Sequence, residues 1–237
     1  MAQSVYLPEL VIRGSETTSP PRHSAVVRIT HWITTLSFVA LLVSGIMILI
    51  AHPRLYWGET GGVGAPSLID LPIPFKIGYS GWGRYVHFLS AWLVVLTGLV
   101  YLLEGFSTGH FKRELVPSGE RLGWSSFWRS VVDHLRLKPP AEEEFHTYNL
   151  LQRLSYLSVV FVLFPLVILT GLGMSPAIAS VVPALVNGMG GQQSARTLHF
   201  FVSSLLVLFF LVHILMVIVA GFTSRMRAMI TGRTSHE

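Results

Sequence analysis

The feature that most constrains this chain is its last apolar segment, residues 196–222, because it is long enough to cross a membrane and yet contains two histidines. A helix needs roughly 20 apolar residues to span the hydrocarbon core of a bilayer. His213 follows His199 by 14 residues, so at about 100° and about 1.5 Å per residue both imidazoles leave nearly the same helix face, about 21 Å apart along the axis. An ionisable residue inside such a segment indicates a functional site. This spacing predicts two stacked metal-centred cofactors, and b-type haem fits best because its iron takes neutral imidazole nitrogens as axial ligands.

Composition places the chain among integral membrane proteins. Of its 237 residues, 51% are hydrophobic and only 12% are charged, whereas a soluble domain has roughly 25% charged residues. The net charge of +5 does not indicate nucleic-acid binding, because the basic residues lie in the connections between apolar runs rather than on one amphipathic surface. The absence of cysteine excludes cysteine-ligated iron–sulfur clusters and covalently attached c-type haem. Any redox centre in this chain must therefore be held by histidine.

Four apolar segments predict an all-α fold, an integral membrane four-helix bundle that binds two b haems. Pro165 should kink the third span, and the Gly- and Pro-rich residues 51–83 are expected to lack long regular elements. Residues 175–194 form a short loop in this interpretation, and an amphipathic pattern around Trp128 predicts a helix on the membrane surface or against a partner subunit. The predicted division is an N-terminal segment, four spans within residues 26–222, and a tail: 1–25, then about 26–50, 84–104, 150–174 and 196–222, then 223–237.

The basic residues predict the orientation of the four spans. Thirteen Lys and Arg residues lie on the side that holds the N-terminal segment, the second connection and the tail, and four lie on the other side. Basic residues are enriched in cytoplasmic connections. Both termini and the second connection are therefore expected in the cytoplasm.

This orientation sorts four histidines into two depths. His87 and His199 share the outer side, and His31 and His213 share the inner side, which predicts two cross-membrane pairs and two haems with iron bound by these four residues. The inner pair is less well matched, because His31 looks shallower than its partner unless the first helix extends into the cytoplasm with some tilt.

Other interpretations of the histidines stay open at this point. His52 is an alternative to His87, and His146 is an alternative to His31. A lone intramembrane histidine also fits a proton relay or a buried hydrogen-bonded residue. Four arginines lie near the two membrane faces, where they fit either partners of haem propionates or anchors of the helix ends: Arg28, Arg84, Arg153 and Arg196.

Several motifs together resemble the di-haem cytochrome b subunits of thiosulfate reductases, nickel–iron hydrogenases and formate dehydrogenases, which belong to the bacterial cytochrome b-561 superfamily. The resemblance covers nearly the whole chain after about residue 22. It rests on the spacing of the last two histidines, the pair His31-Trp32, HPRLYWG after the first span, GRYVHF around His87, and YNLLQRLSYL at the start of the third span.

The resemblance implies that the first and last of the four histidines hold a haem on the cytoplasmic side and the middle two hold one on the periplasmic side. It also implies the bacterial inner membrane as the location and a quinone site next to the inner haem. Asn149 and Gln152 match the positions of that quinone site, whereas the glycine usual between them in the formate dehydrogenase type is Leu151 here.

Three functions are compatible with these observations. The leading one is a membrane electron-transfer subunit that passes electrons between a periplasmic redox partner, a molybdopterin enzyme or a hydrogenase, and the quinone pool. The alternatives are a stand-alone quinone-linked oxidoreductase that acts on a small redox substrate at the outer haem, and a haem-free proton-conducting membrane protein. The chain shows no soluble catalytic domain, which favours the first function.

The aromatic residues of the first connection predict where such a partner would dock. Tyr56, Trp57, Tyr79 and Trp82 lie between the first span and His87, and Tyr and Trp are enriched in the cores of protein interfaces. Anchoring at the lipid headgroups would also explain them.

Overall fold

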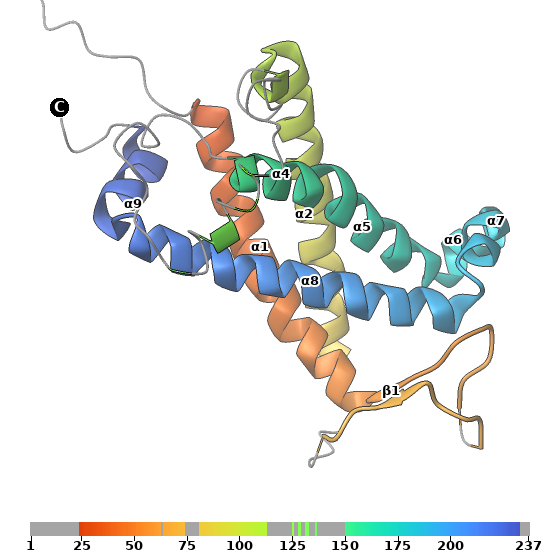
Figure 1. Ribbon diagram of the computed structural model, residues 1–237. Helices are drawn as coiled ribbons and strands as arrows, with labels where there is room; N and C mark the ends of the chain where they lie inside the picture. The colour runs from red at the N-terminus through yellow and green to blue at the C-terminus, as the bar shows by residue number, and fades with distance from the viewer. Residues whose placement is uncertain are drawn as a thin grey trace, which may run out of the picture.

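The structure, a computed structural model, describes residues 24–62, 64–73, 81–112, 125, 128, 131–132, 136 and 150–232. Four of its helices are long and apolar enough to cross a membrane. In Figure 1 the first two of these pack side by side, the last two pack side by side, and the two pairs cross. The spans are α1 (Ala25–Ala51), α2 (Gly81–Ser107), the third helix composed of α4 (Leu150–Ser158), η4 (Val159–Leu163) and α5 (Phe164–Gly173), and α8 (Gln192–Val219).

The packing of these helices is that of a protein embedded in lipid. The buried residues of α1 are Thr30, Ser37 and Ser44, spaced seven residues apart on one face. Large apolar side chains such as Leu36 (70% exposed) and Leu103 (71% exposed) point outward. Small polar residues between helices allow close approach of the backbones, while lipid covers the apolar exterior. The structure is mostly helical with four candidate spans, in agreement with the expected membrane architecture, and the chain is a multi-pass membrane protein.

The third span contains the irregularity that Pro165 predicts. Proline lacks a backbone N–H and cannot donate to the carbonyl four residues earlier. The helix meets this constraint with the π turn η4, in which the Phe164 N–H donates to the carbonyl of Val159, five residues earlier, and Pro165 stands in the first turn of α5. A π turn inserts one residue into an α-helix. The third span consequently contains one residue more than an uninterrupted α-helix of the same length along its axis would contain.

The connections contain more structure than the sequence predicts. At the end of the bundle that is expected to face the periplasm, which we call the outer end, β1 (Arg54–Leu55) pairs antiparallel with β2 (Ile69–Asp70). These two short strands agree with the expected lack of long elements among the described residues of the first connection. The third connection was expected to be a loop but forms two short helices, α6 (Pro176–Val181) and α7 (Pro183–Gly188). The tail forms α9 (Phe222–Thr231), bounded by Gly221 and Gly232 with positive φ. The expected surface helix around Trp128 lies almost entirely outside the described residues.

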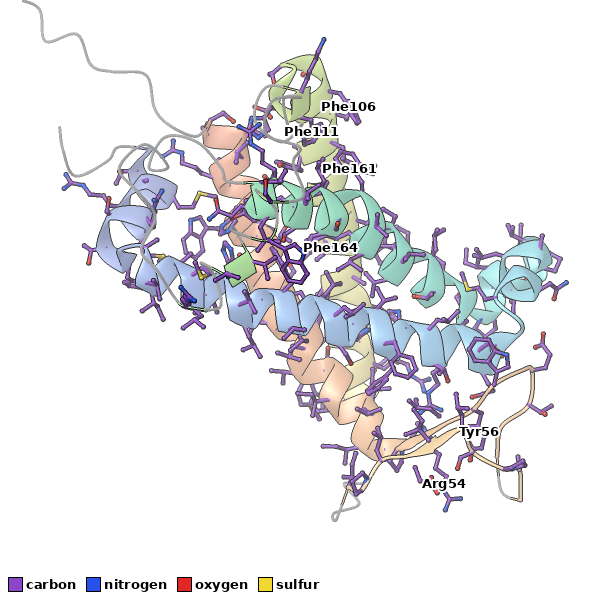
Figure 2. The ribbon with its side chains drawn as sticks, viewed as in Figure 1. Arg54, Tyr56, Phe106, Phe111, Phe161 and Phe164 are labelled. Atoms are coloured by element: carbon purple, nitrogen blue, oxygen red, sulfur yellow. The ribbon has the colours of Figure 1, made fainter. Side chains whose placement is uncertain are left out.

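An aromatic cluster joins α2 to the third span at the inner end of the bundle (Figure 2). The ring of Phe111 lies 5.1 Å from that of Phe106, 5.2 Å from that of Phe161 and 5.4 Å from that of Tyr101, between ring centres. A Cβ on Gly105 would lie 2.3 Å from the Phe111 ring, so glycine is required there. The cluster fills the space between these two helices.

Candidate functional site

The structure brings the four predicted histidines together in two pairs. His87 on α2 faces His199 on α8, with ring centres 6.3 Å apart and ring planes at 64°. His31 on α1 faces His213 on α8, with ring centres 6.5 Å apart and ring planes at 56°. Each pair joins two different helices, so the two sites tie α1 and α2, the first helix pair, to α8 of the second pair.

The separation of the rings matches two imidazoles that share one metal ion. An iron atom bound on opposite sides by two imidazole nitrogens, each about 2 Å away, separates the ring centres by roughly 6 Å. The two pairs meet this requirement at 6.3 and 6.5 Å. His31 therefore lies level with its partner, although the sequence alone makes it look shallower. Helix α1 reaches that depth because it crosses α8 at an angle (Figure 1).

Each outer histidine has a hydroxyl group at its Nδ1 atom. Ser44 Oγ lies 3.0 Å from Nδ1 of His87, and Thr170 Oγ1 lies 3.1 Å from Nδ1 of His199. Hydrogen bonding at Nδ1 leaves Nε2 as the nitrogen that can bind a metal. Neither hydroxyl residue was predicted from the sequence, although each stands directly before a glycine, as Ser44-Gly45 and Thr170-Gly171.

The inner pair has a different environment. The ring of His213 stacks on Phe209, with ring centres 5.8 Å apart and planes at 20°, and Trp32 meets the edge of the His31 ring at 5.4 Å. The Nδ1 atom of His31 is buried and, among the described residues, has no hydrogen-bond partner. The inner imidazoles are thus held mainly by aromatic contacts.

The outer loop is fixed to the start of α8, near the outer pair. The Gly58 carbonyl accepts hydrogen bonds from the backbone N–H groups of Gln193 and Ser194, at 3.0 and 3.3 Å, and Thr197 Oγ1 donates to the Tyr56 carbonyl at 2.6 Å. The first N–H groups of a helix have no partner within the helix. The Gly58 carbonyl supplies one and so caps α8 two turns before His199.

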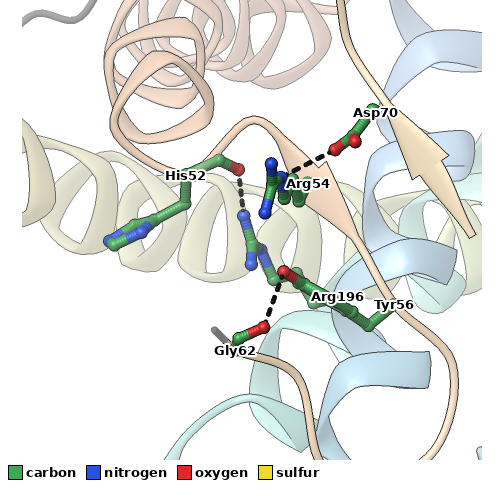
Figure 3. Close-up of polar contacts among 6 residues, drawn as sticks. All are labelled: His52, Arg54, Tyr56, Gly62, Asp70 and Arg196. Carbon is green, nitrogen blue, oxygen red and sulfur yellow. Dashed lines mark hydrogen bonds and ion pairs between the residues drawn. The ribbon is translucent and has the colours of Figure 1, made fainter. Parts of the chain in front are cut away.

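The predicted arginines occupy several different settings. Arg196 donates to the backbone carbonyl of His52 (Figure 3), and Arg28 donates to the Ile230 carbonyl at 2.9 Å. The Nε atom of Arg28 is buried and has no partner within the described part of the chain. Arg84 is exposed and Arg153 is partly buried, and both residues make further interactions.

His52 lies at the outer end of α1 and is exposed. In Figure 3 its imidazole points away from Arg196, while its backbone carbonyl faces that guanidinium. Desolvation, followed by the positive charges of Arg196 and Arg84, lowers the pKa of His52. The ring that the structure places against His199 is that of His87. The other alternative ligand, His146, lies outside the described residues.

The predicted quinone residues fall at the start of the third helix. Asn149 lies outside the described residues, and Gln152 is partly buried on α4. One turn further, the ring of Tyr156 contacts that of Phe209 at 6.2 Å, and Phe209 stacks on His213. The first turns of α4 are therefore connected to the inner histidine pair by a short chain of aromatic rings.

The prokaryotic cytochrome b561 family matches residues 22–232 of this sequence. The chain belongs to this family. The expected resemblance to the cytochrome b-561 superfamily is thereby confirmed, and the protein is a b-type cytochrome that transfers electrons in a membrane as an oxidoreductase subunit. Membership of the family implies that this cytochrome binds b haem.

Individual relatives of this cytochrome carry two kinds of name. A protein of Azospira oryzae named as the YedZ1 subunit of a protein-methionine-sulfoxide reductase is 30% identical over 198 residues, which cover 82% of this chain and 89% of the relative. Proteins named as Ni/Fe-hydrogenase B-type cytochrome subunits are each 26% identical. The matched region with the protein of Azotobacter vinelandii covers 86% of this chain and 82% of that relative. The matched region with the protein of Azotobacter chroococcum covers 81% of this chain and 77% of that relative. No solved structure matches significantly.

Proposed function

We propose that this cytochrome carries electrons across the membrane between a redox partner on the outer face and the quinone pool on the inner side, through two b haems. The observation that carries the proposal is the presence of two histidine pairs whose rings are separated by the distance that one bis-imidazole iron requires. His87 and His199 hold the outer haem in this assignment, and His31 and His213 hold the inner one. A bound haem supplies a one-electron ferric–ferrous couple.

The residues around the outer pair fit a haem ligand set. Metal-binding histidines almost always donate their second ring N–H to a nearby oxygen, which fixes the tautomer and the orientation of the ring. Ser44 and Thr170 provide such oxygens at 3.0 and 3.1 Å. Arg28, Arg84, Arg153 and Arg196 lie towards the ends of the spans and are proposed to pair with the propionates of the two haems.

The inner site is proposed to exchange electrons with quinone at Asn149 and Gln152. Polar side chains at a membrane boundary can donate hydrogen bonds to a quinone carbonyl. The aromatic chain from Tyr156 through Phe209 to His213 supports this location, since it connects the first turns of α4 with the inner pair. Reduction of quinone there would take its protons from the cytoplasmic side.

The outer partner is proposed to be a molybdopterin enzyme or a hydrogenase subunit. The relatives named as subunits of a reductase and of hydrogenases support a partner of this kind. Trp57, in the loop after β1, is 58% exposed and Trp82, in the first turn of α2, is 55% exposed, whereas Tyr56 is only 8% exposed. Tyr56 therefore belongs to the internal packing of the loop, and Trp57 and Trp82 are the predicted aromatic residues that the structure describes as exposed and available for docking. Tyr79 lies outside the described residues.

The direct test is the haem content and redox titration of the purified full chain. A pyridine haemochrome assay should give two b haems per polypeptide, and the titration should resolve two one-electron transitions. Both transitions should equilibrate with a quinone analogue in proteoliposomes. A ratio of one haem, or none, would contradict the proposed pair of sites.

The proposed orientation has a separate test. This cytochrome is proposed to lie in the inner membrane of a bacterium with both termini in the cytoplasm. The distribution of basic residues supports this orientation. A reporter that is active only after export, fused after Glu237, should be silent. The same reporter inserted after Gly64 in the outer loop should be active, and the reverse pattern would exchange the outer and inner haems.

A further inference from the structure

The environment of the outer imidazoles is built twice from the same parts. On α1, Ser44 meets His87 of α2, and on α5, Thr170 meets His199 of α8. In both cases the hydroxyl residue belongs to the helix that packs beside the histidine's own helix. The repetition at two separate helix contacts indicates a requirement of the outer site rather than an accident of packing at one of them.

The direction of these hydrogen bonds follows from the bonds that the hydroxyl groups already make. Ser44 Oγ lies 2.7 Å from the carbonyl of Ala40, and Thr170 Oγ1 lies 2.7 Å from the carbonyl of Leu166. A hydroxyl has one proton to donate, and a carbonyl can only accept it. The hydroxyl proton therefore goes to the carbonyl, and the hydroxyl oxygen accepts the Nδ1–H of the histidine.

A backbone carbonyl and a glycine complete each environment. The Leu41 carbonyl lies 3.2 Å from Ser44 Oγ, and the Val167 carbonyl lies 3.1 Å from Thr170 Oγ1. A Cβ on Gly171 would lie 3.4 Å from Cε1 of His199, and one on Gly45 would lie 3.6 Å from Cε1 of His87. Each imidazole thus lies against the backbone of the neighbouring helix, with the hydroxyl group at Nδ1.

The inner pair lacks this arrangement on at least one side. Nδ1 of His31 is buried and has no partner among the residues that the structure describes. Trp32 touches its ring by an edge contact only. The hydroxyl acceptors are therefore a feature that separates the outer site from the inner one.

We propose that Ser44 and Thr170 are positioning residues that hold the outer imidazoles in the Nε2-binding tautomer and lower the reduction potential of the outer haem. The proposal rests on the assignment of His87 and His199 as ligands of that haem. An Nδ1–H that donates to oxygen raises the basicity of the ligand nitrogen, which stabilises ferric iron more than ferrous iron.

This contribution favours the transfer of electrons from the outer haem to the inner one. A membrane potential that is negative inside opposes the inward movement of an electron, by about 2.3 kcal/mol for each 100 mV across the full membrane. A lower potential at the outer haem offsets part of that cost. The two hydroxyl groups therefore assist the flow of electrons from the outer partner towards quinone.

The test uses redox titration of the full-length protein with three substituted forms, Ser44→Ala, Thr170→Val and the double variant. Each single substitution should raise the midpoint of the outer haem by about 59 mV, which corresponds to a tenfold change in the ferric-to-ferrous ratio. The midpoint of the inner haem should not move, and both haems should remain, because the four histidines are unchanged and the substitutions remove only the oxygen next to Nδ1 of an outer imidazole. The low-field EPR g value of the outer haem should shift as well, since it depends on the orientation of the imidazole planes.

Two matched controls separate this effect from a general loss of hydroxyl groups. Ser204 and Thr97 donate to the carbonyl four residues earlier at 2.8 and 2.7 Å, as Ser44 and Thr170 do. Their described hydrogen bonds involve carbonyl oxygens and Thr34 rather than an imidazole. Ser204→Ala and Thr97→Val should leave both midpoints unchanged, and Thr170→Ser, which keeps the hydroxyl, should keep the original outer midpoint.

Distinct results would overturn the proposal. An unchanged outer midpoint in the double variant, an equal shift in either control, or loss of the outer haem in both Thr170→Val and Thr170→Ser would each contradict it. Failure of the underlying haem assignment looks different, because the unsubstituted protein would then lack the second haem, or His87→Ala would retain both.

Discussion

The two helix pairs of this cytochrome, α1 with α2 and the third span with α8, are alike at their outer ends. An arginine and a histidine on α2 recur on α8 after 112 residues. A hydroxyl residue followed by glycine on α1 recurs on α5 after 126 residues, whereas Arg28 near the start of α1 recurs as Arg153 after only 125. The π turn lies between Arg153 and α5, and the one residue that it inserts explains why the interval grows from 125 to 126. The corresponding residues are Arg84 and Arg196, His87 and His199, Ser44 and Thr170, and Gly45 and Gly171.

The inner ends of the same helix pairs differ. At the interval of 125, the counterpart of His31 on the third span is Tyr156, and at the interval of 112 the counterpart of His213 on α2 is Tyr101. The ring of Tyr101 packs on Phe111 in the aromatic cluster (Figure 2). The outer pair thus joins two residues at equivalent positions, His87 on α2 and His199 on α8. The inner pair joins His31 on α1 with His213 on α8, whereas the equivalent positions on the other helices hold Tyr156 and Tyr101 instead of histidine. The comparison indicates an outer histidine pair that the two halves share and an inner histidine pair on one flank only.

The largest expected effect is the loss of a complete haem from the substituted site. His87→Ala and His199→Ala should each remove the outer haem alone, because one imidazole does not retain a bis-histidine haem. If the two outer ends are equivalent, both variants should give the same spectrum and one haem per chain in the pyridine haemochrome assay. His31→Ala and His213→Ala should remove the other haem.

His52→Ala is the control for this series, because its exposed ring lies outside both pairs. It should retain two haems. Loss of the outer haem in His52→Ala, with retention in His87→Ala, would exchange the two assignments and break the correspondence between the helix pairs.

The second effect concerns the capped start of α8. Gly191 has φ of 113°, and a Cβ there would lie 2.5 Å from the backbone of Gly58. Gly191→Ala should therefore destabilise the folded state by roughly 2 kcal/mol through strain and displacement of the capping loop. The thermal midpoint in detergent should fall, and the outer haem should be released before the inner one.

Gly62→Ala is the matched substitution in the same loop. No atom lies within 4 Å of a Cβ at Gly62, and its φ is not positive. Its thermal midpoint should equal that of the unsubstituted protein. Equal losses in both variants would show that the loop, and not the cap on α8, sets the stability of the outer end.

The third effect is on partner binding at the outer face. Trp57→Ala should weaken capture of the periplasmic partner about 30-fold, the effect of losing a hot-spot residue of about 2 kcal/mol. Both haems should remain, because Trp57 is exposed, and the aromatic rings described against the histidine pairs are those of Trp32 and Phe209. Trp92→Ala, which removes a 60% exposed tryptophan from the middle of α2, should bind the partner normally. If Trp57→Ala binds as well as Trp92→Ala does, headgroup anchoring is the role of Trp57.

The four apolar runs of the sequence predicted the four helices that are long and apolar enough to cross a membrane. The histidine pairs stay a proposal, which the ring separations of 6.3 and 6.5 Å support. The sequence did not reveal Ser44 and Thr170 as partners of the outer imidazoles. Those contacts depend on how α1 crosses α2 and α5 crosses α8, which side-chain packing decides. The cap on α8 was missed for a similar reason, since Gly58 and Gln193 lie 135 residues apart and meet only after folding. Helix α9 was not predicted either, although the glycines that bound it, Gly221 and Gly232, are a local signal in the sequence.

The smallest expected effect is at the inner end, where the halves differ most. If quinone binds beside His213, Gln152→Leu should slow reoxidation of the inner haem by a quinone analogue about fivefold, since one hydrogen bond contributes about 1 kcal/mol. Asn149→Leu should do the same, but Asn149 could also act as the N-cap of α4. Asn149→Ser separates these roles, because serine caps a helix equally well and lacks the amide. A slow rate in Asn149→Ser supports the quinone contact, and a normal rate assigns Asn149 to the cap.

Asn187→Leu, an exposed substitution on α7 at the other end of the bundle, should leave the rate unchanged. Normal rates in both Gln152→Leu and Asn149→Leu would move the quinone site away from the third span, and the difference between the inner ends would then concern haem binding alone.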